Sequence, residues 1–323
     1  MSGGLAVVLS GGGAPAAYFG AGVLQALEDR GMRADVLSGV SAGAINACAA
    51  GIGMTAGDLA RMWGGIRWSD IYRPRFDVWN AINVGRLLRP TTSVVEYALG
   101  AIGWTHLLET APARRTLTNQ FGGAQVRPAR GTTIVVSAVD ENSGEVVRFC
   151  SKLPPPHRAD PQFRQVDLTV EHILASAAVP LLFPPGRVGP NPTHRLVDAG
   201  MFANTPLAPA MHYEPDRVVV VSGSGVGRPS AEPDSLGSAI ALLAENVAHY
   251  ALRADLDHAE TVNKLATAAP ETTAKRTVPI LTIEPTDLGF SVDGFLRFGP
   301  DEARALIEYG RETADKALAG WPG

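Results

Sequence analysis

The sequence predicts an α/β fold in which a mostly parallel central sheet is covered by helices on both faces. Short runs rich in β-branched and other apolar residues alternate with longer segments that favour helix. The first run, residues 5–9, ends at three glycines, and apolar residues at helical spacing follow soon after. Strands that alternate with helices in this way imply a mostly parallel sheet with a helical layer on each side.

The individual elements follow from these two patterns. The expected strands are residues 5–9, 35–38, 132–139, 145–150, 217–221 and 278–283. The expected helices are residues 18–29, 42–50, 235–265 and 301–318. The turn residues 140–144 lie between the third and fourth strands and predict a hairpin there.

Composition narrows the class of protein. The chain has 323 residues with no visible repeat, so we expect a single domain over residues 1–323. Its formal net charge of −4 argues against nucleic acid as a partner. Cys48 and Cys150 are too few for a disulfide scaffold or a thiolate metal site. The amino terminus lacks a basic segment before its short apolar run, so we expect a cytoplasmic protein without a signal peptide or transmembrane helix.

Residues 39–43 read Gly-Val-Ser-Ala-Gly and match the G-x-S-x-G pattern of serine hydrolases. The pattern lies between an expected strand and an expected helix, where a sharp turn projects the Ser41 hydroxyl clear of the sheet. Gly39 and Gly43 supply the small residues that such a turn needs. The alternative is a tight turn with Ser41 as a helix cap.

Ser10 and the three glycines after it follow the first strand and open a helix. Backbone N–H groups converge at such a place, which suits an anion, either a phosphate or the oxyanion of an acyl-transfer intermediate. The glycines do not lead into a G-K-[ST] ending, and no lysine precedes Lys152. The pattern therefore favours the oxyanion.

A nucleophilic serine needs a base, and histidine is a poor candidate in this sequence. No histidine follows His258, although a Ser-Asp-His triad usually takes its histidine from late in the chain. Asp198, in contrast, ends a short apolar run just before Gly200. A carboxylate there can act directly as general base, or it can simply stabilise a turn.

Together these elements resemble the patatin-like phospholipase family, which has a glycine-rich oxyanion loop, G-x-S-x-G and a downstream D-G-[GA]. The resemblance extends to the family's A-S-x-A-x-P-x-x-F-P-P segment, which this chain matches at Ala175, Ser176, Ala178, Pro180, Phe183, Pro184 and Pro185, and to Asn204 and Pro206. The motifs cover residues 5–206, and residues 207–319 are expected to complete the same domain.

The resemblance implies a lipid acyl hydrolase of the phospholipase A or lysophospholipase type, acting through a Ser-Asp dyad and an acyl-enzyme. Ser41 would be the nucleophile and Asp198 the general base, and the amides of Gly11, Gly12 and Gly13 would form the oxyanion hole. Gly39, Gly43 and Gly200 would support these motifs. The implied substrate is a phospholipid or another acyl ester, and no metal or other cofactor is required.

Two departures from the family pattern leave alternatives open. Pro15-Ala16 replaces the usual basic residue and glycine after the glycine triplet, and Ala199 replaces the usual glycine after the acid. A soluble carboxylesterase or thioesterase acting on small esters, or a non-catalytic lipid-binding relative, would keep the same motifs. The aromatic and arginine residues of 63–88 suggest either peripheral membrane contact or ordinary surface packing.

Overall fold

A computed structural model of the chain describes residues 4–75, 105–188, 194–223, 236–268, 276–286 and 294–321. The strands are β1 (Leu5–Leu9), β2 (Ala34–Gly39), β3 (Arg73–Pro74), β4 (Leu108–Glu109), β5 (Thr133–Asp140), β6 (Val146–Cys150), β7 (Phe163–Gln165), β8 (Leu196–Asp198), β9 (Arg217–Val221) and β10 (Ile280–Ile283). The helices are α1 (Gly13–Asp29), α2 (Ala42–Gly51), α3 (Ala56–Gly65), α4 (Trp68–Ile71), α7 (Ala111–Gln120), α8 (Val170–Ser176), α9 (Gly200–Ala203), α10 (Leu207–Met211), α11 (Leu236–Ala268) and α12 (Pro300–Leu318).

One mixed sheet forms the centre of the fold, in the strand order β10-β9-β1-β2-β5-β6-β7. The pairs from β10 through β9, β1 and β2 to β5 are parallel, as is the pair β6 and β7. β6 pairs with β5 antiparallel, which confirms the predicted hairpin. The short strand β8 also pairs with β5 antiparallel.

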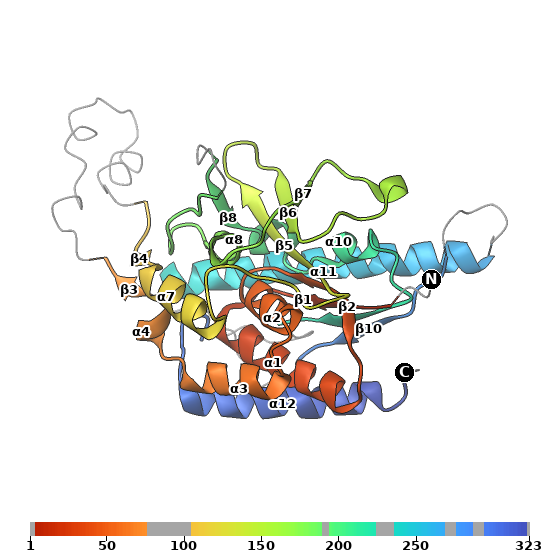
Figure 1. The fold of residues 1–323 in the computed structure, drawn as a ribbon, viewed down its shortest axis with the longest axis horizontal. Coiled ribbons are helices and arrows are strands. Elements are labelled where there is room, and N and C mark those ends of the chain that lie inside the picture. Colours follow the sequence, from red (N-terminus) through yellow and green to blue (C-terminus); the bar gives the residue numbers. More distant parts are fainter. Residues whose placement is uncertain are drawn as a thin grey trace.

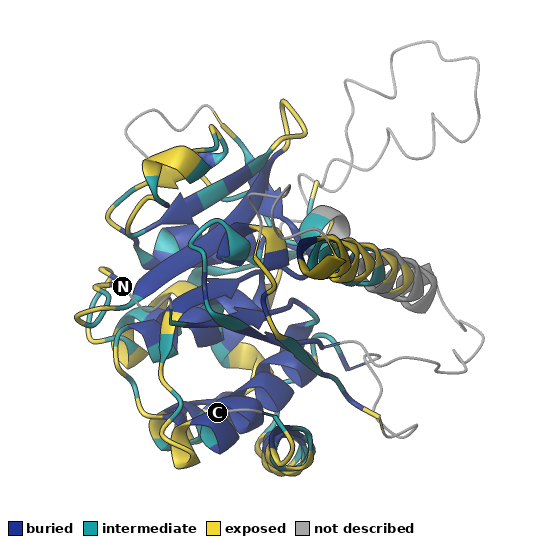
Figure 2. Ribbon diagram, turned by 90° about the vertical axis from the view of Figure 1, so that its right-hand side faces the viewer, coloured by how far each residue is buried: buried dark blue, intermediate teal, exposed yellow. Residues whose placement is uncertain are grey.

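Helices cover both faces of the sheet and give the predicted three layers (Figure 1). Alternate residues of β1 separate the two faces, because successive side chains of a strand point to opposite sides. Val7 and Leu9 belong to the larger apolar core with α1, α2, α3 and α12, whereas Ala6 and Val8 pack with α10 and α11. The central strands β9, β1, β2 and β5 and the helix α1 are mostly buried, and the outer helices carry much of the exposed surface (Figure 2).

The element boundaries differ from expectation in two informative places. α1 begins at Gly13 and not at residue 18. The sequence pattern missed its first residues because these small, buried residues show no apolar spacing that would mark them as helical. β10 begins at Ile280 and not at residue 278. Pro279 lacks the N–H that a ladder position requires.

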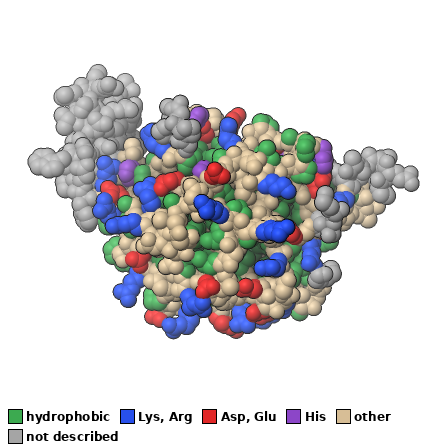
Figure 3. Space-filling model, viewed as in Figure 1, with side chains coloured by type: hydrophobic (Ala, Val, Ile, Leu, Met, Phe, Trp, Pro, Cys, Tyr) green, Lys and Arg blue, Asp and Glu red, His purple; other side chains and the backbone are tan. Residues whose placement is uncertain are grey.

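The surface carries no large field of one sign on the face shown in Figure 3, where acidic and basic side chains are interspersed. This distribution agrees with the small net charge of the chain. Within the described residues, no helix combines the length and the apolar character that crossing a bilayer would need.

The aromatic segment is only partly described, because Phe76, Trp79 and Arg86 lie outside the described residues. Trp63 is fully buried, and its indole N–H donates to the Asn46 side chain at 2.8 Å. Trp68, in contrast, is 49% exposed. Trp63 is therefore a packing residue, whereas Trp68 faces solvent.

Candidate active site

Ser41 occupies a sharp turn between the end of β2 and the start of α2. Its φ of 55° and ψ of −124° lie outside the conformations that a non-glycine residue usually adopts. The turn also brings backbone segments into close contact, since a Cβ atom on Gly43 would lie 2.2 Å from the Leu9 carbonyl oxygen. A Cβ on Gly39 would lie 2.5 Å from the carbonyl oxygen of Gly43. A side chain at position 39 or 43 would therefore collide with the backbone of this turn.

The edge of β5 brings Asp198 to the same place. Gly39 of β2 pairs with Val136, and Asp198 of β8 pairs with Ala138. β6 pairs with both positions of β5, so β2 and β8 must share the other edge, one beyond the other. Asp198 therefore lies just past the end of β2, where the turn places Ser41.

The two predicted catalytic side chains lie near each other in the interior. Ser41 and Asp198 are each only 4% exposed, and the Ser41 side chain is close enough to the Asp198 carboxyl to lower its pKa. The N–H of Gly200 donates to the Asp198 carboxylate at 2.7 Å. Burial raises the pKa of Asp198 to about 6, and the nearby Ser41 side chain and the hydrogen bond from the N–H of Gly200 partly offset this rise.

The glycine loop lies at the amino terminus of α1 and is held in place by Ser10. The Ser10 hydroxyl accepts from the N–H of Gly223 at 2.6 Å and donates to the carbonyl of Gly11 at 3.1 Å. Gly12 and Gly13 have φ values of 137° and 65°, a region that favours glycine. The loop thus orients its amides where the helix dipole is positive.

The three glycine amides are not equivalent. The N–H of Gly11 donates to the Asn204 carbonyl at 3.2 Å. Among the described residues, neither Gly12 nor Gly13 has a backbone acceptor for its N–H. Two of the three predicted oxyanion donors are therefore available, and the third helps to hold the loop against the chain after Asp198.

A family model described as "Patatin-like phospholipase" matches residues 7–211, and the match covers every motif described above. The chain belongs to the patatin-like phospholipase family. No curated protein matches its sequence.

Two solved structures are similar to this patatin-like chain over 98% of its length. They are VipD from Legionella pneumophila, at 14% identity and a TM-score of 0.44, and the type III effector protein ExoU, at 16% identity and a TM-score of 0.41. The chain spans 66% of the VipD chain and 53% of the ExoU chain.

Pro15-Ala16, where this chain departs from the family pattern, is accommodated within α1 without loss of helix. Pro15 lies in the first turn of α1, where its missing N–H costs no intrahelical bond. Ala16 fits because its neighbours are glycines, since a Cβ on Gly12 would lie 2.9 Å from the Ala16 Cβ. The departure removes a positive charge from this patatin-like domain but leaves the glycine loop intact.

Most of the histidines in the patatin-like chain are engaged away from Ser41. Within the described residues, hydrogen bonds link His106 to Thr105, His157 to Glu214, His172 to Thr169, His194 to Asp140 and His212 to Arg158. Burial lowers the pKa of His172 to about 4. This distribution agrees with the expectation that Asp198 and not a histidine is the partner of Ser41.

An apolar pocket of about 60 Å³ adjoins Ser41. Its wall contains apolar residues from both ends of the chain, which sequence patterns could not bring together. The lining residues include Ile45, Trp63, Ile71, Ala113, Leu117, Ile173, Phe183, Phe295, Leu296 and Phe298. Such a wall suits an acyl group better than a polar one.

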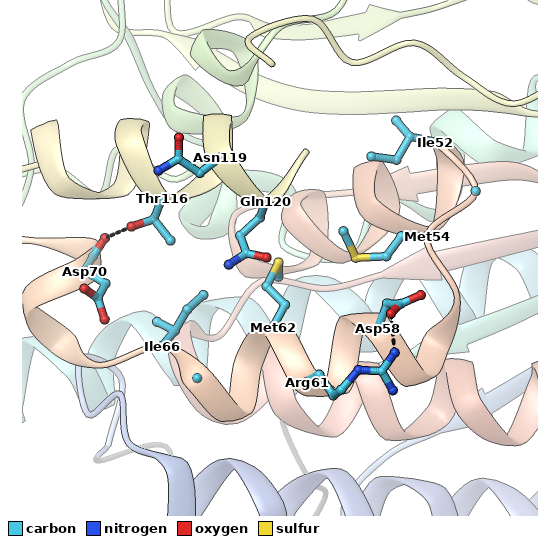
Figure 4. Close-up of a pocket in the computed structure, with 12 residues that line it drawn as sticks. Ile52, Met54, Asp58, Arg61, Met62, Ile66, Asp70, Thr116, Asn119 and Gln120 are labelled. Carbon is cyan, nitrogen blue, oxygen red and sulfur yellow. Dashed lines mark hydrogen bonds and ion pairs between the residues drawn. The ribbon is translucent and has the colours of Figure 1, made fainter. Parts of the chain in front are cut away.

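A larger cavity of about 740 Å³ lies elsewhere, among the end of α2, α3, α4 and α7 (Figure 4). It contains none of the predicted site residues. Asp58 and Arg61 on its wall form an ion pair with each other, and the Thr116 hydroxyl donates to the carbonyl of Asp70. By volume alone this cavity would be the candidate active site. The proximity of Ser41 and Asp198 instead favours the smaller pocket as the candidate active site.

The buried Asp198 carboxylate predicts a gain in stability when its charge is removed. The folded-state pKa is raised above the usual value of 3.8, so Asp198 favours folding in its protonated form, and this contribution is lost as the pH rises through about 6. We expect Asp198→Asn to increase the free energy of unfolding at pH 8, by on the order of 1–3 kcal/mol.

Urea denaturation of both proteins at pH 8 and pH 4.5 tests this expectation. The gain should shrink at pH 4.5, where the wild-type carboxyl is largely protonated in the folded state. A variant that is less stable than wild type at pH 8 would contradict the assignment of a destabilising buried charge.

Proposed function

We propose that the chain hydrolyses fatty-acyl esters of lipids, with Ser41 as nucleophile and Asp198 as general base. The observation that carries the proposal is the juxtaposition of these two buried side chains, with Ser41 lining an apolar pocket. Family membership supports the same class of reaction. The implied activity is of the phospholipase A or lysophospholipase type.

The proposed reaction has two half-reactions that use only groups of the chain. Ser41 Oγ attacks the ester carbonyl while its proton passes to the Asp198 carboxylate, and the N–H groups of Gly12 and Gly13 stabilise the oxyanion. The intermediate collapses to an acyl-enzyme when the leaving alcohol takes the proton from Asp198. Asp198 then accepts a proton from water, which attacks the acyl carbon. Collapse releases the fatty acid and returns the proton to Ser41.

The small volume of the pocket favours a second candidate function that uses the same reaction chemistry. The pocket has a volume of only about 60 Å³, so as it stands it suits a short acyl group. A long acyl chain requires the pocket wall to move. Hydrolysis of short carboxylic esters or thioesters, without a lipid interface, is therefore the alternative. A panel of esters with acyl chains of two to sixteen carbons, together with phospholipid vesicles, separates the two.

A peripheral contact with lipid is supported by apolar side chains on the surface. Trp68, Leu107 and Leu181 are 49%, 52% and 60% exposed, and the N–H of Leu107 donates to the carbonyl of Leu181 at 3.0 Å. Ile71 in the same helix as Trp68 lines the pocket beside Ser41. A membrane that touched these residues would lie near the pocket.

We expect a fluorophosphonate probe to label the wild-type protein and to lose this labelling in Ser41→Ala, because only an activated serine reacts readily with the probe. In-gel fluorescence of the purified proteins measures the labelling. Ser151→Ala is the control, since Ser151 lies directly after β6 and accepts a hydrogen bond from the N–H of Ile134, away from the dyad. Labelling that survives in Ser41→Ala, or a wild-type protein that is never labelled, contradicts the proposed nucleophile.

The raised pKa of Asp198 predicts the acid limb of the pH profile. Asp198 must be ionised to accept a proton, so kcat/KM should rise about tenfold per pH unit below pH 6 and level off above it. Initial rates on an uncharged ester between pH 4 and 9 give the profile. A rate that stays constant down to pH 4 would exclude a base with this pKa.

A further inference from the structure

The last residue of α8 and the turn after it contact both members of the proposed dyad through their backbone amides. The N–H of Ser41 donates to the hydroxyl of Ser176 at 2.9 Å. The N–H of Asp198 donates to the carbonyl of Ala178, two residues further along, at 2.9 Å. One short segment of chain therefore sets the position of the nucleophile and of its base.

The Ser176 hydroxyl is fixed in orientation by a second bond. It donates its proton to the carbonyl of Ser137 on β5 at 2.7 Å, so a lone pair is left to face the N–H of Ser41. Ser176 and Ser137 are both 0% exposed, and water cannot readily replace either bond. The hydroxyl thus links β5 directly to the turn that carries Ser41.

The Ser176 hydroxyl is important because the backbone N–H of Ser41 needs a hydrogen-bond acceptor. Ser41 is the N-cap residue of α2, and its N–H has no intrahelical acceptor. At 4% exposure, an unpaired N–H would carry a desolvation cost, and the turn at φ 55° would be free to relax. The bond to Ser176 satisfies this N–H and holds the turn in the strained conformation.

The segment before β8 packs against the end of α8 and supports Ser176. Gly186 exchanges backbone hydrogen bonds of 2.7 and 2.9 Å with Leu196, the first residue of β8. A Cβ on Gly186 would lie 2.5 Å from the Cβ of Ala175, so the end of α8 lies directly against this segment. The position of Ser176 is therefore fixed both by the packing of α8 and by the hydrogen bond to β5.

We propose that Ser176 is a positioning residue that aims the Ser41 hydroxyl at Asp198, while the Ala178 carbonyl fixes the Asp198 backbone. The inference rests on the proposed function and adds a role for the hydroxyl of the A-S-x-A segment. Loss of this hydroxyl frees the turn at Ser41 without removing a reacting group. A misplacement of about 1 Å at a reacting centre can lower a rate about 100-fold.

The test compares Ser176→Ala with Ser151→Ala in the full chain. Both remove a hydroxyl that accepts a backbone N–H, at 2.9 Å in one case and 3.0 Å in the other. We expect Ser176→Ala to lower kcat and the rate of fluorophosphonate labelling by about 10- to 100-fold, with KM within about twofold of wild type. Ser151→Ala should keep the wild-type rates, even where the two variants lose similar thermal stability.

Ser176→Cys keeps the side-chain shape, is only slightly larger, and replaces the oxygen by a weak acceptor, so an intermediate labelling rate is expected. This variant decides the test if Ser176→Ala does not fold. A wild-type labelling rate in either folded variant, or an equal loss of rate in Ser151→Ala, overturns the positioning role. Failure of the wild-type protein to be labelled would instead overturn the proposed function, so the two failures are distinguishable.

Discussion

The edge of β5 shared by β2 and β8 is the constraint on which the rest of the candidate site depends. β2 ends opposite Val136, and β8 takes up the same edge at Ala138 with the opposite direction. Two segments separated by more than 150 residues in sequence thereby end at one point. The turn after β2 has to be sharp and β8 has to be short for their side chains to meet, which explains the strained Ser41 and the three residues of β8.

This arrangement lowers the stability of the fold, because it buries the carboxylate that the proposed reaction requires. A carboxylate that is 4% exposed loses most of its hydration, and the N–H of Gly200 and the nearby Ser41 side chain offset only part of this loss. The pKa near 6 is the direct consequence. Such a carboxylate is ionised at neutral pH yet basic enough to accept a proton from a serine hydroxyl. Packing of the surrounding sheet and helices offsets this loss of folding stability at the site.

Sequence patterns predicted the architecture well because each strand and helix carries its own periodicity. Strands such as residues 217–221 are continuous apolar runs, and the parallel sheet follows from their alternation with helices. The glycine loop, Ser41 and Asp198 could be recognised because their chemistry requires particular residues in short motifs. The contact between them could not be derived, since it depends on the register of β8 along β5.

Long-range contacts were invisible in the sequence for the same reason. Phe295 and Phe298 line the pocket beside Ser41 although they lie more than 250 residues away. Ser176 was recognised only as part of a family segment, and its bond to the N–H of Ser41 needed the fold. The unequal roles of Gly11, Gly12 and Gly13 likewise depend on Asn204, which holds one of the three amides.

The most direct test of this account is a crystal structure of the protein after reaction with an alkyl fluorophosphonate. The account predicts phosphorus bonded to Ser41 Oγ, with the phosphoryl oxygen within hydrogen-bond distance of the N–H groups of Gly12 and Gly13 and the Asp198 carboxylate beside Oγ. The alkyl chain should enter the apolar pocket. An adduct on another residue, or a phosphoryl oxygen turned away from the glycine loop, would contradict it.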